Sequence, residues 1–215
     1  MKNQMKKYIL TTVIVFVFTF TNAQEIKFGA KAGLNIANLT GYFPDSSPLT
    51  GFDVGVFAEI KIANKFAVQP ELLFSTQGNK MKVPVLDASS DYLYSYDGKW
   101  NLSYLNLPVM AKYYILDKLS IETGPQIGLL LSAKAKYSSD DRALPSLNTS
   151  TAEYDIKNYI KSVDLGLNFG ATYDFSENLS VNFRYNLGLA NINNEPMSSS
   201  NIKNKVLSLS LGYKY

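Results

Sequence analysis

The 215-residue chain contains no cysteine, no histidine and a single tryptophan. Without cysteine it has no disulfides, no thiolate nucleophile and no zinc–thiolate site. Without histidine the Ser-His-Asp and Cys-His arrangements are excluded, as are most zinc, copper and non-haem iron sites. The Walker A, dinucleotide-binding and lipase-elbow patterns are also absent from the sequence. We therefore expect no catalytic residues, no metal and no cofactor.

A net charge is also lacking outside the first segment. Lys2, Lys6 and Lys7 lie in residues 1–23, which contain no acidic residue, so residues 24–215 hold 18 basic and 18 acidic residues. This balance does not support a basic surface for nucleic acid, and no nucleic-acid partner is expected.

Residues 1–23 have the pattern of a secretory signal. A basic start is followed by the apolar run Tyr8–Phe20, and small residues occupy the −3 and −1 positions before the predicted cut. The run has 13 residues, which is short for the roughly 20 that a membrane-spanning helix needs. We predict cleavage after Ala23, so that the mature chain begins at Gln24 outside the cytoplasm. The alternative is an N-terminal membrane anchor.

A period of two runs through residues 24–215. In the segment 179–190, for example, Leu179 and Val181 alternate with Ser180 and Asn182. Successive side chains of a strand point to opposite faces, so each such segment has one apolar and one polar face. The pattern predicts no helix and eight strands, over Ile26–Ile36, Phe52–Ile62, Phe66–Thr76, Asn101–Tyr114, Leu119–Ala135, Val163–Phe175, Leu179–Ala190 and Leu207–Tyr215.

The connections between these strands alternate in length. Three are tight, at 63–65, 116–118 and 176–178, and four are long and polar, at 38–50, 77–99, 137–160 and 192–204. All long loops therefore lie at one end and both termini at the other. Eight antiparallel strands in this order expose two edges unless the first pairs with the last. We predict an all-β fold, an eight-stranded up-and-down barrel over residues 24–215.

Alternation alone does not decide which face is outside. A secreted soluble barrel would line a cavity for a small apolar ligand with its apolar face, whereas a membrane barrel turns that face to lipid. The polar face is rich in Gly and Ser, and the apolar faces suffice for the 9–11 residues of a transmembrane strand. Aromatic residues gather near the tight turns, as in an interfacial girdle: Phe66, Tyr113, Tyr114, Tyr173, Phe175, Tyr213 and Tyr215. We predict a monomeric transmembrane barrel with periplasmic termini and extracellular long loops.

Several fragments resemble the PorT-type outer-membrane β-barrel domain of diderm bacteria of the Bacteroidota. They are FGAKAGLNIANLTG, VQPELLFSTQG, YLNLPVMAKYYI, IETGPQIGLLLSAK, FRYNLGLANI and the terminal LSLGYKY. The resemblance covers essentially all of 24–215 and implies an outer-membrane location and an accessory role in secretion.

The chain end resembles the signal that the outer-membrane assembly machinery reads, with Leu209, Leu211, Tyr213 and the terminal Tyr215 at alternate positions. The alternative is that Tyr215 is merely a girdle residue. Expected partners are outer-membrane lipid and the assembly machinery. Secretion-system or extracellular proteins are further candidates.

Six charged side chains fall on the polar face: Lys31, Glu59, Glu71, Lys112, Glu122 and Arg184. Unpaired charges in a confined interior are costly, so these residues are predicted to pair and to plug the lumen. A selectivity filter or a paired-carboxylate site is the alternative. Eight strands leave no open pore, which argues against a general porin and leaves a narrow channel for small solutes as a secondary possibility.

Tyrosines alternate in the second long loop, at Tyr92, Tyr94 and Tyr96. They indicate either a hairpin extended beyond the membrane or a surface that binds protein or glycan, because exposed tyrosine offers contact area at low entropic cost. In the third long loop Asp140, Asp141 and Glu153 could hold a cation, although they lack the spacing of an EF-hand.

Three prolines fall inside predicted strands, Pro70, Pro108 and Pro125. Because proline cannot donate to a ladder, bulges or locally missing bonds are expected there.

The sequence as a whole predicts a non-enzymatic outer-membrane barrel with a structural, surface-interaction or secretion-accessory role. An enzyme embedded in the membrane is disfavoured, because such barrels typically depend on a histidine.

Overall fold

The computed structural model describes residues 25–41, 46–86, 93–139, 151–195 and 200–215. These residues form nine β-strands and one short 3₁₀ helix. The elements are β1 (Ile26–Thr40), β2 (Ser46–Ala63), β3 (Phe66–Leu86), β4 (Leu93–Leu116), β5 (Leu119–Ser139), β6 (Thr151–Asp155), η1 (Lys157–Tyr159), β7 (Val163–Asp174), β8 (Leu179–Gly188) and β9 (Lys203–Lys214).

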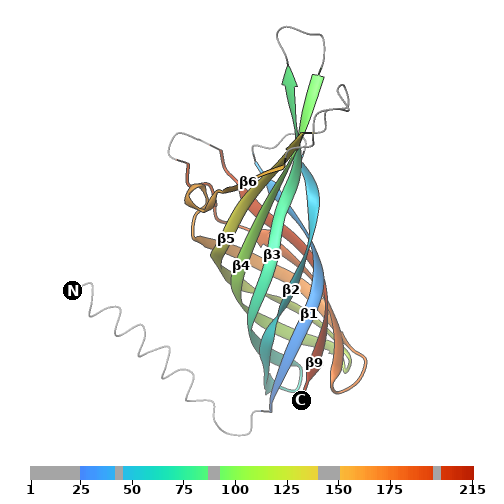
Figure 1. The fold of residues 1–215 in the computed structure, drawn as a ribbon. Coiled ribbons are helices and arrows are strands. Elements are labelled where there is room, and N and C mark those ends of the chain that lie inside the picture. Colours follow the sequence, from blue (N-terminus) through green and yellow to red (C-terminus); the bar gives the residue numbers. More distant parts are fainter. Residues whose placement is uncertain (1–24, 42–45, 87–92, 140–150, 196–199) are drawn as a thin grey trace, which may run out of the picture.

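Eight of the strands close into a ring, as Figure 1 shows. Each pairs antiparallel with its neighbour in the order β1, β2, β3, β4, β5, β7, β8, β9, and β9 pairs back with β1. Closure removes both sheet edges, because every strand of the ring has two partners. The prediction of an eight-stranded up-and-down barrel is confirmed.

Six of the eight ring strands extend further at the long-loop end than the sequence analysis predicted, whereas β7 begins at the predicted Val163 and β8 ends at Gly188, two residues before the predicted end. β3 and β4 remain paired as far as Leu86 and Leu93, inside the predicted loop 77–99. β6 was missed, and it pairs with the far part of β5 outside the ring. The sheet of β3, β4 and β5 therefore continues past the ring, at the end opposite the C-terminus (Figure 1).

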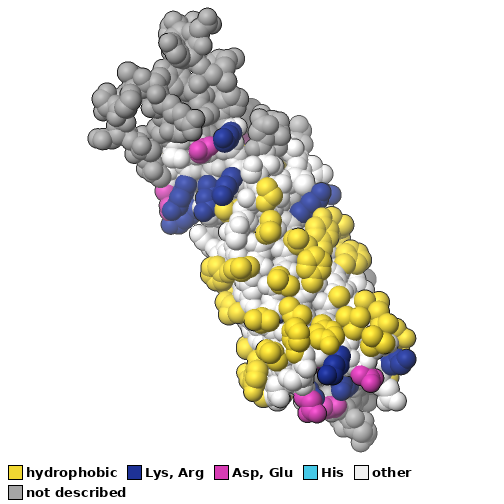
Figure 2. Space-filling view, turned by 90° about the vertical axis from the view of Figure 1, so that its right-hand side faces the viewer, with side chains coloured by type: hydrophobic (Ala, Val, Ile, Leu, Met, Phe, Trp, Pro, Cys, Tyr) yellow, Lys and Arg dark blue, Asp and Glu magenta, His cyan; other side chains and the backbone are white. Residues whose placement is uncertain are grey.

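The two faces of the sheet have the polarity of a membrane barrel. On β9 the side chains of Leu209 and Leu211 are 57% and 58% exposed, whereas Ser210 and Lys214 are buried. Figure 2 shows apolar side chains over the middle of the barrel, with charged side chains towards both ends. Polar residues thus face the axis and apolar residues face outward, as in transmembrane β-barrels.

An aromatic girdle lies near the tight turns. Phe66 packs against Tyr113 with ring centroids 4.9 Å apart, and Tyr173 packs against Phe175 at 5.1 Å. Tyr114 was wrongly included in this girdle, because its side chain is buried. It follows Tyr113 on β4, and the period of two turns it to the interior.

The three prolines interrupt the ladders without shifting them. Pairing of β3 with β4 skips the residues between Pro70 and Leu73, and pairing of β4 with β5 skips those between Pro108 and Ala111. The register is the same on both sides of each gap, so the predicted bulges do not occur at these prolines. Pro125 pairs with Leu167 in an unbroken β5–β7 ladder, but on the side of β4 it lies in the gap between Thr123 and Gln126. Proline has no backbone N–H to donate, so a few backbone pairs are missing locally while the register is kept.

An apolar core fills the interior at the long-loop end. It comprises Leu39, Leu102, Tyr104, Leu130, Ala133, Ile160, Ile192 and Ile202. The first five belong to strands, and the three isoleucines come from segments between strands. The interior is therefore polar towards the tight turns and apolar towards the long loops, a division that the alternating pattern did not predict.

No helix in the described part of the chain is long and apolar enough to cross a membrane.

Candidate functional site

The six charged residues predicted for the lumen come from six different strands, and all are buried. The period of two aims each of them at the barrel axis, because every one occupies the polar face of its strand. The structure gathers them into two groups: Lys31, Glu71, Glu122 and Arg184 in one, and Glu59 and Lys112 in the other.

Arg184 lies at the centre of the first group. Its Nη1 and Nη2 donate to the two carboxylate oxygens of Glu71, both at 2.8 Å. Its Nε and Nη2 also donate to Oε1 of Glu122, at 2.9 and 2.6 Å. Lys31 adds a second cation, with its Nζ 3.0 Å from Oε2 of Glu71. Two carboxylates thus face two cations, and such charge-assisted, bidentate bonds are among the strongest in proteins.

Neutral side chains complete the coordination of Glu122. Asn182 Nδ2 donates to its Oε1 at 2.8 Å, and Thr172 Oγ1 donates to its Oε2 at 3.2 Å. Buried carboxylates are tolerated only where their remaining lone pairs are satisfied. The first group meets this condition on both oxygens of Glu122.

The second group surrounds Glu59 nearer the tight turns. Lys112 Nζ lies 2.7 Å and Lys214 Nζ 3.2 Å from its Oε2, and the hydroxyl of Tyr114 donates to its Oε1 at 2.7 Å. Lys214 is also paired with Asp174, at 3.0 Å. Three side chains from β4 and β9 therefore meet at the carboxylate of Glu59 on β2.

Gln69 joins the two groups. Its Oε1 accepts a bond from Lys112 at 3.1 Å, while its Nε2 donates to Glu71 at 2.7 Å. The residues that the sequence analysis missed here are Gln69, Tyr114, Asp174 and Lys214. The alternating pattern carried a signal for each, since all four occupy the polar face of their strands.

Next to these groups lies a layer of amides and hydroxyls. Asn168 donates to Gln126 at 3.2 Å, Asn186 donates to Asn168 at 3.0 Å, and Ser210 donates to Asp53 at 3.0 Å. The cavity in this layer has a volume of about 30 Å³, room for about one water molecule. Side chains therefore fill this part of the lumen.

Phe57 also fills the lumen, although its residue type belongs on the outer face. It is 6% exposed, and any side chain at Gly29 would clash with its ring. Gly29 thus provides the space in which the ring packs.

The arrangement suits structural pairing better than chemistry. Glu71 and Glu122, the closest approach to a paired-carboxylate site, are both bound to Arg184. Among the described residues there is no group of three or more Asp and Glu side chains that could hold a metal ion. Glu153, a candidate cation ligand in the third long loop, is instead paired with Lys134 and Lys136.

The remaining predicted residues lie elsewhere. The side chains of Leu209, Leu211 and Tyr213 face outward on β9, and Tyr215 follows that strand with its amide donating to Phe28 O. Tyr94 and Tyr96 belong to β4, where their backbones pair with β3, which confirms a hairpin at these positions. Three predicted residues, Ala23, Gln24 and Tyr92, lie outside the described residues, as do Asp140 and Asp141.

A closed ring of eight strands with an apolar exterior and a polar interior defines the class of outer-membrane β-barrels. The protein belongs to the outer membrane protein beta-barrel domain family, whose model matches residues 22–194. No curated protein sequence matches the chain.

Several solved structures are similar to the chain. Ail, the attachment invasion locus protein of Yersinia pestis, is 13% identical, with 89% of this chain and 99% of that chain covered and a TM-score of 0.50. Neisserial surface protein A is 16% identical, with coverage of 90% and 100% and a TM-score of 0.47. A major outer membrane protein of Thermus thermophilus is 14% identical, with coverage of 89% and 100% and a TM-score of 0.48. At 13% identity the likeness to Ail concerns the fold alone.

Proposed function

We propose that this outer-membrane barrel is non-enzymatic, that its lumen is plugged, and that its long-loop end is an interaction surface outside the cell. The observation that carries the proposal is the continuation of β3, β4 and β5 past the ring, with β6 added to β5. Such an extension adds nothing to the transmembrane ring, which is complete without it. Its place at the end away from the C-terminus supports a role in surface contact (Figure 1).

Three features of the interior support a plug. Ion pairs tie Arg184 to Glu71 and Glu122 across the lumen, the neighbouring amide layer leaves a cavity of about 30 Å³, and apolar side chains pack at the far end. An ion crossing this interior would have to break buried ion pairs and then pass a dehydrated apolar layer. These features disfavour the narrow-channel alternative. The outward apolar face disfavours the soluble barrel.

The orientation is part of the proposal. Tight turns and the C-terminus lie at one end and the long connections at the other (Figure 1), and outer-membrane barrels have short periplasmic turns and long extracellular loops. We place the tight turns in the periplasm. The PorT-type resemblance suggests an accessory role in secretion as a second candidate.

Cysteine labelling tests the orientation without background, because the chain has no cysteine. Ser47 on β2 is exposed at the long-loop end and Asn64 is exposed in a tight turn, so Ser47→Cys and Asn64→Cys form a matched pair. A membrane-impermeant maleimide should label Ser47→Cys on intact cells and Asn64→Cys only after lysis. The reverse pattern contradicts the proposed orientation.

Two further measurements test the plug and the role. In planar bilayers the purified barrel should give no steady conductance, and a reproducible open level would overturn the plug.

Cross-linking in native membranes followed by co-purification separates the two roles, the interaction surface and the secretion accessory. Extracellular or surface proteins among the cross-linked species support the interaction surface, whereas subunits of a secretion machine support the accessory role.

A further inference from the structure

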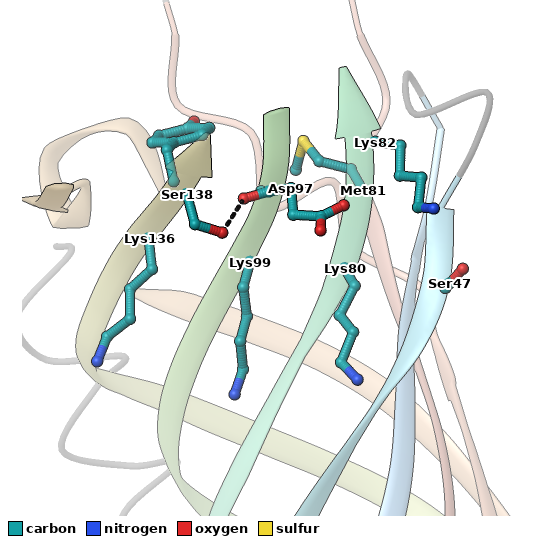
Figure 3. Close-up of a pocket in the computed structure, with 10 residues that line it drawn as sticks. Ser47, Lys80, Met81, Lys82, Asp97, Lys99, Lys136 and Ser138 are labelled. Atoms are coloured by element: carbon teal, nitrogen blue, oxygen red, sulfur yellow. Dashed lines mark hydrogen bonds between the residues drawn. The ribbon is translucent and has the colours of Figure 1, made fainter. Parts of the chain in front are cut away.

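Three lysines form a row across the extended sheet at the long-loop end. Lys80 on β3 pairs in register with Lys99 on β4, which pairs in register with Lys136 on β5. Neighbouring strands are about 4.8 Å apart, so the three lysines start from adjacent points of one sheet face. Figure 3 shows their side chains running parallel, with the ammonium groups directed along the strands towards the barrel.

Such a row is unfavourable unless an anion lies beside it, because like charges directly opposite one another in a sheet repel. At one end Glu153 on β6 supplies an anion. Its carboxylate lies 2.6 Å from Lys134 Nζ and 2.8 Å from Lys136 Nζ, and the bond from Lys134 lowers the pKa of Glu153 to about 2. Glu153 therefore stays ionised and balances the β5 end of the row.

Among the described residues, Lys80 and Lys99 have no comparable partner. No carboxylate of the described residues lies within 4.0 Å of either ammonium group. A recess of about 460 Å³ lies at this part of the sheet, lined by Lys80, Lys82, Lys99 and Lys136 among others, with Asp97 as its one acidic residue. Recesses of 300–1,000 Å³ are typical of small-ligand sites, and this one carries a surplus of positive charge.

The row lies just beyond the lipid-facing surface. On β4 only two outward residues, Asn101 and Ser103, separate Lys99 from Leu105, and on β5 Lys134 follows the exposed Leu131 by three residues. Lysines at the edge of an apolar surface lay their methylene stems along it and hold the ammonium group at the level of the polar headgroups. The direction of the side chains in Figure 3 matches this arrangement.

We propose that Lys80, Lys99 and Lys136 bind the phosphate groups of a phosphorylated glycolipid in the membrane leaflet at the long-loop end. A phosphate offers several strong acceptor oxygens, and lysine binds it as a point charge. A phosphate between neighbouring ammonium groups would remove the repulsion within the row. The leaflet is the source that fits, because the ammonium groups are directed towards the lipid-facing belt. This inference rests on the proposed orientation only for naming the leaflet as the outer one.

The test compares two double variants of equal charge. Lys80→Gln/Lys99→Gln removes the unpaired part of the row, and Lys65→Gln/Lys118→Gln removes two exposed lysines at the tight turns. The barrel is purified in an uncharged maltoside detergent and titrated with lipid A, a diphosphorylated glycolipid. Native mass spectrometry of the detergent-solubilised barrel measures how much lipid A is bound at each concentration. Heat-dependent gel mobility verifies that each variant is folded.

Lipid A should bind the wild type and the tight-turn variant equally, and the Lys80/Lys99 variant about tenfold or more weakly, given the contribution of each lysine near an anionic surface. Equal affinity for all three proteins overturns the site. Two ligand controls separate the sources of phosphate. Lipid A stripped of its phosphates should bind weakly. If inorganic phosphate competes at concentrations similar to those of lipid A, the site binds a soluble anion and the proposal of a lipid ligand is wrong.

Failure of this inference can be distinguished from failure of the proposed function. If Ser47→Cys is not labelled on intact cells while the Lys80→Gln/Lys99→Gln variant binds lipid A more weakly than the wild type, the phosphate site stands and the proposed orientation is wrong. If labelling succeeds and lipid A binds both variants equally, the orientation stands and the phosphate site is wrong.

Discussion

Arg184 on β8 donates two parallel hydrogen bonds of 2.8 Å to the carboxylate of Glu71 on β3, across the interior of the barrel. The two residues are 113 positions apart in the sequence, and their strands are not neighbours in the ring. This buried ion pair thus joins two strands on opposite sides of the ring. Since Arg184 also holds Glu122, one guanidinium connects three strands.

Replacing Arg184 with leucine should destabilise the folded barrel by about 3–5 kcal/mol, because it leaves buried carboxylates without their main partner. Chemical unfolding in detergent or lipid measures the change. Lys118→Leu, at an exposed lysine in a tight turn, is the control for the loss of a positive charge. An unchanged unfolding midpoint for Arg184→Leu would show that the ion pairs do not hold the barrel together.

Lys214→Met should cost less, about 1–3 kcal/mol, the range for leaving a buried acceptor unsatisfied. Lys214 pairs with both Glu59 and Asp174, but Glu59 keeps its bonds to Lys112 and Tyr114. Lys205→Met is the matched control, because Lys205 is on the same strand and only partly buried. If both variants unfold like the wild type, Lys214 does not contribute to closure at β9.

A substitution at the terminal Tyr215 tests whether this residue belongs to the insertion signal or is only a girdle residue. Its side chain is 71% exposed and its ring centroid lies 5.8 Å from that of Tyr213, so Tyr215→Ala should lower the stability of the refolded barrel by only about 0.5–1.5 kcal/mol, the range for one aromatic pair. If the residue is part of the insertion signal, the amount of folded protein in outer membranes should fall several-fold. Tyr173→Ala, a girdle residue on β7 that is 42% exposed, is the control. Equal accumulation of the two variants would leave only the girdle role.

The signal segment makes a prediction that intact mass checks directly. Protein purified from membranes should begin at Gln24, and Ala23→Arg should block cleavage because a small residue is needed at the −1 position. Asn22→Arg changes the less restricted −2 position and should still be cleaved. A mature protein that retains residues 1–23 would instead support an N-terminal anchor.

The sequence predicted what depends on local alternation. Where one face meets lipid and the other the axis, as at Leu209 and Ser210, the period of two places each side chain correctly. Past the lipid-facing belt this contrast is lost. Both faces are polar on β3 around Lys80 and Asn79, whereas on β4 the outward Asn101 is polar and the inward Leu102 belongs to the apolar core. The predicted strands therefore ended early, although the backbone pairing continued.

The partners of the interior charges could not be predicted in the same way. Alternation shows that Arg184 points inward, but its pairing with Glu71 depends on how far each strand is shifted along its neighbour around the whole ring. The apolar core at the long-loop end was missed because Ile160, Ile192 and Ile202 come from segments without a period. Phe57 was missed because a bulky aromatic on the polar face contradicts the pattern, and it fits only where Gly29 leaves room.

The central claim, that leucines on the outside of the barrel contact lipid, can be tested without any substitution. The chain carries leucines on both faces: Leu209 and Leu211 are more than half exposed, whereas Leu102 and Leu130 are buried in the interior. In lipid nanodiscs, nuclear magnetic resonance can detect magnetisation transfer from lipid acyl chains to leucine methyl groups. The account predicts strong transfer to Leu209 and Leu211 and none to Leu102 and Leu130. Transfer from water rather than lipid to the outer pair would contradict it.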